Sequence, residues 1–406
     1  MKKKLLALLL CASLVGVMLV GCGNKDTASK EPAEAAEPAE EAAEPAEAEP
    51  AAEQEESGDT ASGGGTIYVL GPTPDHGWTA QAGTYAEAKV EEINAAGQYK
   101  AVYMPASSGE EQVDQTQTII ANNDAVGVVF FALEDSAKAG QEALIAEDIP
   151  FISFDRIIEG PDQYAILNAS GDNWECGAGI AYWLQQKGMQ PGDVMVTLFG
   201  DNGTVCSRRQ EGFEEFLKGE REYYDDATGE TYKTTTAWTE DEVAALVADY
   251  KTVCDWSADK AYEYLEQKLA DIVKTAKANN NKLFVYSMDD EMTFGFLNLL
   301  EANAVDDATK ADLEAMEVYV SAIGGMQELY DVMEGKSGQS DLANQYFDDM
   351  MSVYFSPKMM TNVIGYMEDY LAGNWSYEVG EGKYEVVWIV DRNNVSDYEG
   401  FTGHAD

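Results

Sequence analysis

Short apolar runs rich in β-branched and aromatic residues alternate with stretches of helical periodicity from residue 66 onward. Runs of this length, bounded by turn residues, are typical of buried strands in a parallel sheet. They predict five strands of a first unit, at residues 67–70, 101–104, 126–131, 151–154 and 165–167. Between the first two, Ala82, Ala86, Val90 and Ile93 recur at helical spacing, with Glu and Lys on the opposite face.

A second series of apolar runs follows the same pattern. Its predicted strands lie at residues 194–199, 232–238, 283–287, 318–323 and 387–390. Residues 239–254 predict an extra helix inserted in this second unit. Strands that alternate with helices favour parallel sheets with right-handed crossovers. We therefore predict an α/β fold made of two doubly wound, Rossmann-like lobes.

The first 65 residues differ from the rest in composition. Lysines at 2–4 and an apolar run at 5–20 are followed by Gly21 and Cys22. This order resembles a bacterial lipoprotein signal with its lipobox, which implies cleavage before Cys22 and lipid attachment to that residue. An uncleaved transmembrane anchor is the alternative. Residues 23–65 are mostly Ala, Glu and Pro and cannot fill a core, so we predict a disordered acidic tether.

The formal net charge of −48 is concentrated in the globular region: residues 1–22 carry +3 and residues 23–65 carry −11, which leaves −40. A region this acidic repels nucleic acid and anionic lipid, so we expect no nucleic-acid partner and membrane contact through the lipid alone.

Cysteine and histidine usage excludes most metal sites. Cys176, Cys206 and Cys254 are odd in number and include no C-x-x-C pair, so their spacing predicts neither a disulfide framework nor a thiolate metal site. The two histidines, His76 and His404, are too few for a histidine-built metal centre. We expect no cofactor.

The segment 150–177 brings polar chemistry to the ends of two neighbouring strands. The run at 151–154 ends in Asp155-Arg156, and the next run ends in Gly171-Asp172-Asn173-Trp174. Ligands of parallel sheets bind beyond the carboxyl ends of the strands. The segment therefore predicts a polar small-molecule site.

Five blocks of sequence resemble, in the same order, the motifs of type I periplasmic sugar-binding proteins of the ribose- and galactose-binding kind. The blocks are Phe154-Asp155-Arg156, Gly171-Asp172-Asn173, and residues 207–213, 255–260 and 287–292. The similarity extends over residues 66–391. Each block alone is a weak signal, and the five in order are a strong one.

The resemblance implies a sugar-binding set whose members come from both lobes. These residues are Asp75, His76, Trp78, Asp155, Arg156, Asn173, Arg209, Trp256, Asp289 and Ser356. Flat aromatic rings suit the C–H face of a sugar, whereas Asp, Asn and Arg suit its rim of hydroxyl groups. No catalytic or metal-binding residue is expected.

Several of these assignments have structural alternatives. Trp78 and Trp256 could be ordinary core residues, and Trp238 competes with Trp256 for the second stacking ring. Asp155 and Arg156 could form a structural ion pair, and His76 could be a plain loop residue. The chain also departs from the family at residues 324–325, where Gly-Gly replaces the usual Asp, and at 132–135, where an Asn is often found.

The family's topology implies a three-segment hinge, with crossings near residues 169–172, 354–356 and 388–390. Lobe 1 would comprise residues 66–171 and 356–388, and lobe 2 residues 172–355 and 389–406. Closure of the hinge over the ligand is the expected motion.

These observations predict a lipid-anchored, extracytoplasmic, monomeric solute-binding protein that delivers a sugar to the permease of an ABC-type importer. A sensor that presents a sugar or a furanose-like signal to a chemoreceptor or kinase is the alternative. An enzyme is less favoured, because neither a G-x-S-x-G nor an H-E-x-x-H motif occurs.

Overall fold

The computed structural model describes residues 64–73 and 77–403. The expectations for the signal segment, Cys22, the tether, Asp75, His76 and His404 lie outside the described residues. Among those that are described, no helix has the length and hydrophobicity needed to cross a bilayer.

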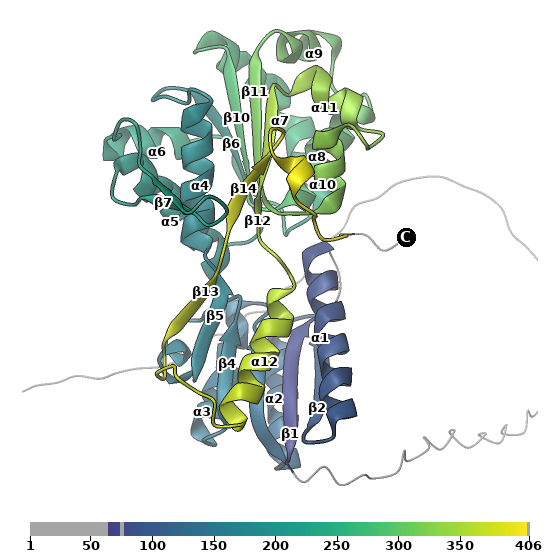
Figure 1. Ribbon diagram of the computed structural model, residues 1–406. Helices are drawn as coiled ribbons and strands as arrows, with labels where there is room; N and C mark the ends of the chain where they lie inside the picture. The colour runs from purple at the N-terminus through teal and green to yellow at the C-terminus, as the bar shows by residue number, and fades with distance from the viewer. Residues whose placement is uncertain (1–63, 74–76, 404–406) are drawn as a thin grey trace, which may run out of the picture. The chain divides into compact units, whose positions relative to one another are not determined.

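Two six-stranded sheets form the framework, and we call the residues around each of them lobe 1 and lobe 2 (Figure 1). In sheet order, the strands of lobe 1 are β13 (Gly382–Glu385), β5 (Leu167–Gly171), β4 (Phe151–Phe154), β3 (Ala125–Phe131), β1 (Thr66–Pro72) and β2 (Lys100–Ala106). Those of lobe 2 are β14 (Trp388–Asp391), β12 (Asp349–Tyr354), β11 (Glu317–Gly324), β10 (Lys282–Ser287), β6 (Val194–Phe199) and β9 (Lys251–Val253).

Both sheets have the doubly wound strand order, in which the first strand lies between the second and the third. All pairs are parallel except β12 with β14. A separate antiparallel hairpin joins β7 (Tyr223–Asp225) to β8 (Glu230–Tyr232). The predicted fold class is therefore confirmed.

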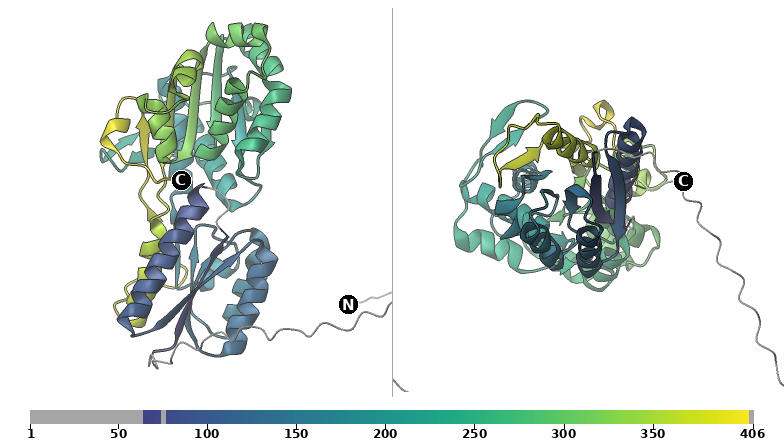
Figure 2. Two further views of the ribbon diagram at one scale, coloured as in Figure 1. Left: turned by 90° about the vertical axis from the view of Figure 1, so that its right-hand side faces the viewer. Right: turned by 90° about the horizontal axis from the view of Figure 1, so that it is seen from below.

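Helices cover both faces of each sheet (Figure 2). The helices of lobe 1 are α1 (Gly77–Ala96), α2 (Gly109–Asn122), α3 (Lys138–Ala146) and α12 (Met359–Leu371), with 3-10 turns at Asp135–Ala137 and Pro161–Tyr164. Those of lobe 2 are α4 (Asn173–Gln186), α5 (Thr204–Lys218), α6 (Glu240–Ala248), α7 (Ala258–Ala278), α8 (Asp290–Glu301), α9 (Asp307–Glu314), α10 (Gln327–Glu334) and α11 (Ser340–Tyr346), with a 3-10 turn at Val395–Asp397.

The chain passes between the sheets three times, from β5 to α4, from β12 to α12 and from β13 to β14. The third passage falls at residues 386–387, because Trp388 already pairs with Tyr354 in the second sheet. It therefore lies just before the range expected from the sequence.

The strand predicted at 232–238 is wrong. Only Tyr232 is in a strand, at the end of the hairpin. The strand that follows β6 along the chain and pairs with it at the edge of the sheet is β9. The helix predicted at 239–254 is too long: α6 starts in a capping box between Thr239 and Glu242 and ends at Ala248, and residues 251–253 form β9. The helix is the ordinary crossover into β9 and not an insertion. The Thr-rich run has the composition of a strand, but its side chains are largely exposed and have no sheet to cover.

Two glycines bring α4 and α5 into close contact. A Cβ on Gly177 would lie 1.9 Å from the Arg209 carbonyl oxygen, and a Cβ on Gly212 would lie 2.1 Å from the Trp174 carbonyl oxygen. The two helix backbones can approach this closely only where no side chain intervenes. Arg209 on α5 is thereby brought beside Asn173 at the start of α4.

We expect Gly177→Ala to destabilise the protein by about 1–3 kcal/mol, the usual cost of overpacking a tight interior contact. Gly365→Ala is the matched control, because it lies in α12 with no atom within 4 Å of the added Cβ and should be neutral or slightly stabilising. Urea unfolding measures both. Equal effects of the two substitutions would contradict the packing account.

Candidate functional site

A cavity of about 330 Å³ lies between the two lobes, at the carboxyl ends of both sets of parallel strands. From lobe 1 it is lined by Pro72, Trp78, Thr79, Ser107, Phe131, Ala132, Leu133, Glu134, Asp155 and Arg156. From lobe 2 and the second connection it is lined by Asp201, Val205, Arg209, Asp255, Trp256, Asp289, Ile323, Gly324 and Phe355.

Asp155 and Arg156 enter the cavity from a tight turn at the end of β4. Asp155 has a φ of 60°, and the N–H of Arg156 donates back to the Phe154 carbonyl at 2.8 Å. Burial raises the pKa of the Asp155 carboxyl, although the nearby charges of Arg156 and Arg209 act in the opposite direction.

Arg156 is almost fully buried and is shared between the lobes. Its Nη2 donates to Oδ2 of Asp201 at 2.6 Å, and its Nη1 lies 3.7 Å from Asp135. Its Nε is buried without a hydrogen-bond partner in the described part of the chain. The ion pair considered between Asp155 and Arg156 is thus replaced by one between Arg156 and Asp201.

Arg209 is held from two sides within lobe 2. Its Nε donates to Oδ1 of Asn173 at 2.8 Å, and its Nη1 donates to the Met288 carbonyl. Its guanidinium also lies 5.1 Å from the ring centre of Phe355 and 5.7 Å from that of Trp256. Asn173 itself does not line the cavity, so it positions Arg209 rather than facing a ligand.

Two adjacent carboxyl groups have separate tasks at the start of α8. Asp289 caps the helix by accepting from the Glu291 N–H at 2.9 Å, and it also lines the cavity. Burial, and then the charge of Asp290, raise the pKa of Asp289 well above its usual value. Asp290 accepts from the N–H groups of Gly325 and Met326, each at 2.7 Å, and thus fixes the Gly-Gly loop that replaces the family's Asp.

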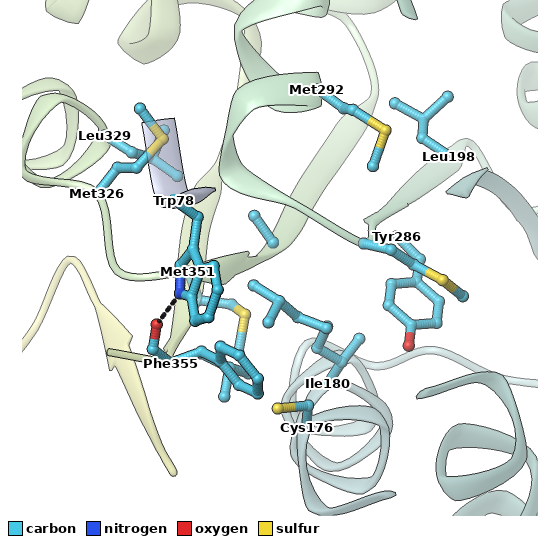
Figure 3. Close-up of a cluster of buried hydrophobic side chains, with 14 of the residues drawn as sticks. Trp78, Cys176, Ile180, Leu198, Tyr286, Met292, Met326, Leu329, Met351 and Phe355 are labelled. Carbon is cyan, nitrogen blue, oxygen red and sulfur yellow. Dashed lines mark hydrogen bonds between the residues drawn. The ribbon is translucent and has the colours of Figure 1, made fainter. Parts of the chain in front are cut away.

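Trp78 forms an aromatic floor with Phe131 and Phe355. Its indole N–H donates to the Phe355 carbonyl at 2.7 Å, as Figure 3 shows, and the two rings lie 5.5 Å apart. Phe131 meets the indole edge-on at 5.9 Å. Trp78 is therefore both a core residue and a cavity residue, and its polar atom is already used.

Trp256, and not Trp238, is the second tryptophan at the cavity. Its ring lies against Gly200, where a Cβ would come within 2.2 Å of the indole. Asp255 and Trp256 have φ values of 48° and 59°, a conformation that costs a bulky residue energy. Trp238 is buried in the core of lobe 2 instead.

The structure brings six of the ten predicted site residues to the cavity, namely Trp78, Asp155, Arg156, Arg209, Trp256 and Asp289. It does not bring Ser356 there, because the Ser356 hydroxyl accepts from the Lys358 N–H at 3.3 Å and it is the neighbouring Phe355 that lines the cavity.

The sequence reasoning missed Asp201, Asp255, Phe131 and Phe355. Asp201 could have been found, because it follows a predicted strand just as Asp155 does. The two phenylalanines look like any other buried strand-end residue in the sequence.

Cys176, Cys206 and Cys254 are buried, free thiols. Burial raises the pKa of Cys206 to about 11 and that of Cys176 and Cys254 to about 12. Within residues 64–73 and 77–403, no group of three or more His, Cys, Asp or Glu side chains is arranged to hold a metal ion.

Residues 67–368 match the periplasmic binding protein domain family, so the chain belongs to that family. No curated protein matches the sequence. Solved structures match at low identity and therefore support the fold.

One is the periplasmic binding component of the arabinose ABC transporter from Shewanella sp. ANA-3, bound to L-arabinofuranose, with 16% identity, 82% of this chain and 93% of that chain covered and a TM-score of 0.58. A galactofuranose-binding protein has 16% identity, coverage of 82% and 96% and a TM-score of 0.60. A solute-binding protein from Clostridium phytofermentans with bound β-D-glucose has 19% identity, coverage of 82% and 95% and a TM-score of 0.56.

The buried carboxyl group of Asp290 predicts a pH-dependent stability. Burial raises its pKa to about 6, so the folded state holds a proton that the unfolded state, with a pKa near 3.8, releases earlier. The free energy of unfolding should therefore fall as the pH rises from about 4 to about 6. A change of about two pKa units corresponds to about 3 kcal/mol.

Asp290→Asn should remove this part of the pH dependence, and the fully exposed Asp307→Asn, with the same change in charge, should not. Urea unfolding between pH 4 and pH 7 compares the three proteins. Parallel curves for native protein and Asp290→Asn would show that Asp290 does not titrate in this range.

Proposed function

We propose that this chain is an extracytoplasmic solute-binding protein that captures one sugar by hinge closure and delivers it to an ABC-type importer. The observation that carries the proposal is the cavity between the lobes, where Asp155 and Arg156 of lobe 1 face Arg209, Trp256 and Asp289 of lobe 2. Membership in the periplasmic binding protein family supports this role.

The polar groups of the cavity complement hydroxyl groups. A sugar hydroxyl both donates and accepts a hydrogen bond. Arg156 and Asp155 both line the cavity, the first with the donors of its guanidinium group and the second with the acceptor oxygens of its carboxyl group. A hydroxyl placed between them would satisfy both, and the bonds would be of the stronger, charge-assisted kind.

The size and charge of the cavity narrow the class of solute. A volume of about 330 Å³ is near the lower end for small-molecule sites, which suits one sugar ring rather than a chain of them. Five carboxyl groups and two guanidinium groups line it, namely Glu134, Asp155, Asp201, Asp255 and Asp289 against Arg156 and Arg209. This excess of acid disfavours sugar phosphates and uronic acids, so we propose a neutral monosaccharide or cyclic polyol.

Similar folds hold ligands of this class. The structures from Shewanella sp. ANA-3 and Clostridium phytofermentans contain arabinofuranose and glucose, and a solute-binding protein from Bacillus halodurans C-125 contains myo-inositol. They support a five- or six-membered ring with several hydroxyl groups as the cargo of this chain.

Lipid on Cys22 and the acidic segment 23–65 would keep the protein beside its membrane partner. A tether between protein and membrane converts the encounter with a permease into a local event at high effective concentration. This part of the proposal rests on the sequence alone.

A thermal-shift screen of the purified protein with neutral pentoses, hexoses and inositols tests the proposal. A ligand at about one hundred times its Kd should add about 2.7 kcal/mol to the free energy of unfolding. Trp256→Ala should weaken binding of the hit by about tenfold or more, because it removes a ring face from the cavity.

Trp375→Ala is the matched control: this tryptophan is also half-buried, but it packs on Tyr370 and Tyr377 and does not line the cavity. The proposal is contradicted if no neutral sugar stabilises the protein, or if only sugar phosphates do. It is also contradicted if Trp256→Ala binds the hit with unchanged affinity.

A further inference from the structure

The only contact between charged side chains that crosses the cavity within the described residues joins Arg156 of lobe 1 to Asp201 of lobe 2. The two atoms Nη2 and Oδ2 lie 2.6 Å apart, and the side chains are 6% and 27% exposed. Water screens a pair this poorly exposed far less than a surface pair, so breaking it costs more. This contact can form only while the lobes are closed on one another.

Asp201 is held in place for this contact by its own lobe. Its Oδ1 accepts from the Gly203 N–H at 2.7 Å, and its N–H donates to Sγ of Cys206 at 3.4 Å. One carboxylate oxygen is thus bound to the backbone before α5, and the other is left for Arg156. Little side-chain entropy is lost when the pair forms, because Asp201 is already ordered.

Gly203 provides the space in which the Arg156 guanidinium lies. A Cβ at this position would lie 1.9 Å from Nη1 of Arg156 and 3.1 Å from its Cζ. The backbone of Gly203 has φ −84° and ψ −174°, which any residue can adopt. The glycine therefore leaves room for the Arg156 guanidinium, and an added Cβ would also lie 3.0 Å from Oδ1 of Asp201 in lobe 2.

Arg156 also has a partner that moves with its own lobe. Its Nη1 lies 3.7 Å from Asp135, in the turn before α3, so the guanidinium does not lose every counter-charge when the lobes separate. The arginine can exchange one carboxylate for another. Such a pair of alternative partners makes both an open and a closed arrangement accessible.

We propose that Asp201 and Gly203 form a latch that closes lobe 2 on Arg156 without any ligand, and that this latch sets how long a bound solute is retained. The latch occupies Nη2 of Arg156, a residue that also lines the cavity in which the solute would bind. The retention of solute rests on the proposed function, whereas closure of the empty protein does not.

The distance between the lobes in the ligand-free protein tests the latch. Fluorophores attached through azido side chains at the exposed positions Glu110 of α2 and Asp259 of α7 report it by single-molecule energy transfer. The native protein should show a substantial short-distance population without ligand. Asp201→Asn and Gly203→Ala should each shift it towards the long distance.

Asn202→Ala is the matched control, because Asn202 is exposed and lies between the two latch residues, and no hydrogen bond or ion pair joins it to Arg156 in the described part of the chain. Urea unfolding identifies any variant whose change in lobe distance comes from lost stability. Asp201→Asn removes a charge and Gly203→Ala adds a Cβ, so the two variants are not expected to lose stability for the same reason. A native protein that is entirely open without ligand, or identical distances in all four proteins, would overturn the latch whatever the solute is.

Once a solute is identified, its rate of dissociation from the native protein and the variants provides a second test of the latch. Both latch variants should release it about tenfold faster or more, whereas association changes little, as is usual when one partner of a poorly exposed charge pair is removed. If the variants lose the short-distance population but release the solute no faster, the latch acts only in the empty protein, and its role in retention is contradicted. A panel without any hit would refute the proposed function and leave the distance result standing.

Discussion

The buried guanidinium of Arg209 is the constraint on which the rest of the site depends. A buried charge must be paired or hydrogen-bonded, and here Asn173 and the Met288 carbonyl meet that need. Asn173 can reach it because Gly177 and Gly212 let α4 and α5 touch. The same guanidinium lies against Phe355, so the second connection between the lobes is packed on a charge held in lobe 2.

Several residues that line the cavity have a strained backbone conformation. Asp155, Asp255 and Trp256 have positive φ values, although none is glycine. Residues in this conformation persist only where their surroundings hold them, as Gly200 does for the Trp256 ring. The strain therefore marks the positions where the side chain must point into the cavity rather than into the sheet.

The sequence predicts the two doubly wound lobes well, because buried parallel strands are continuous apolar runs that differ clearly from the helices between them. It fails at 232–238, where a strand-like composition has no sheet to cover, and it misses β12, which pairs with β11 and leads into the second crossing between the lobes.

For the site, chemistry at strand ends predicts Asp155 and Arg156, and the resemblance to the family adds Asp289. Phe131, Phe355 and the pairing of Arg156 with Asp201 depend on which residues meet across the lobes, and no local pattern carries that information. Ser356 is the opposite case, a residue that the sequence assigns to the site and the structure does not. Its hydroxyl belongs to a local turn, and the residue before it lines the cavity.

A crystal structure of the protein grown with the solute from the screen would show whether a neutral sugar binds between the lobes. We expect one sugar ring between Trp78 and Trp256, with hydroxyl groups bonded to Asp155, Arg156 and Arg209. A solute bound elsewhere, or a cavity that stays empty while the solute stabilises the protein, would contradict it.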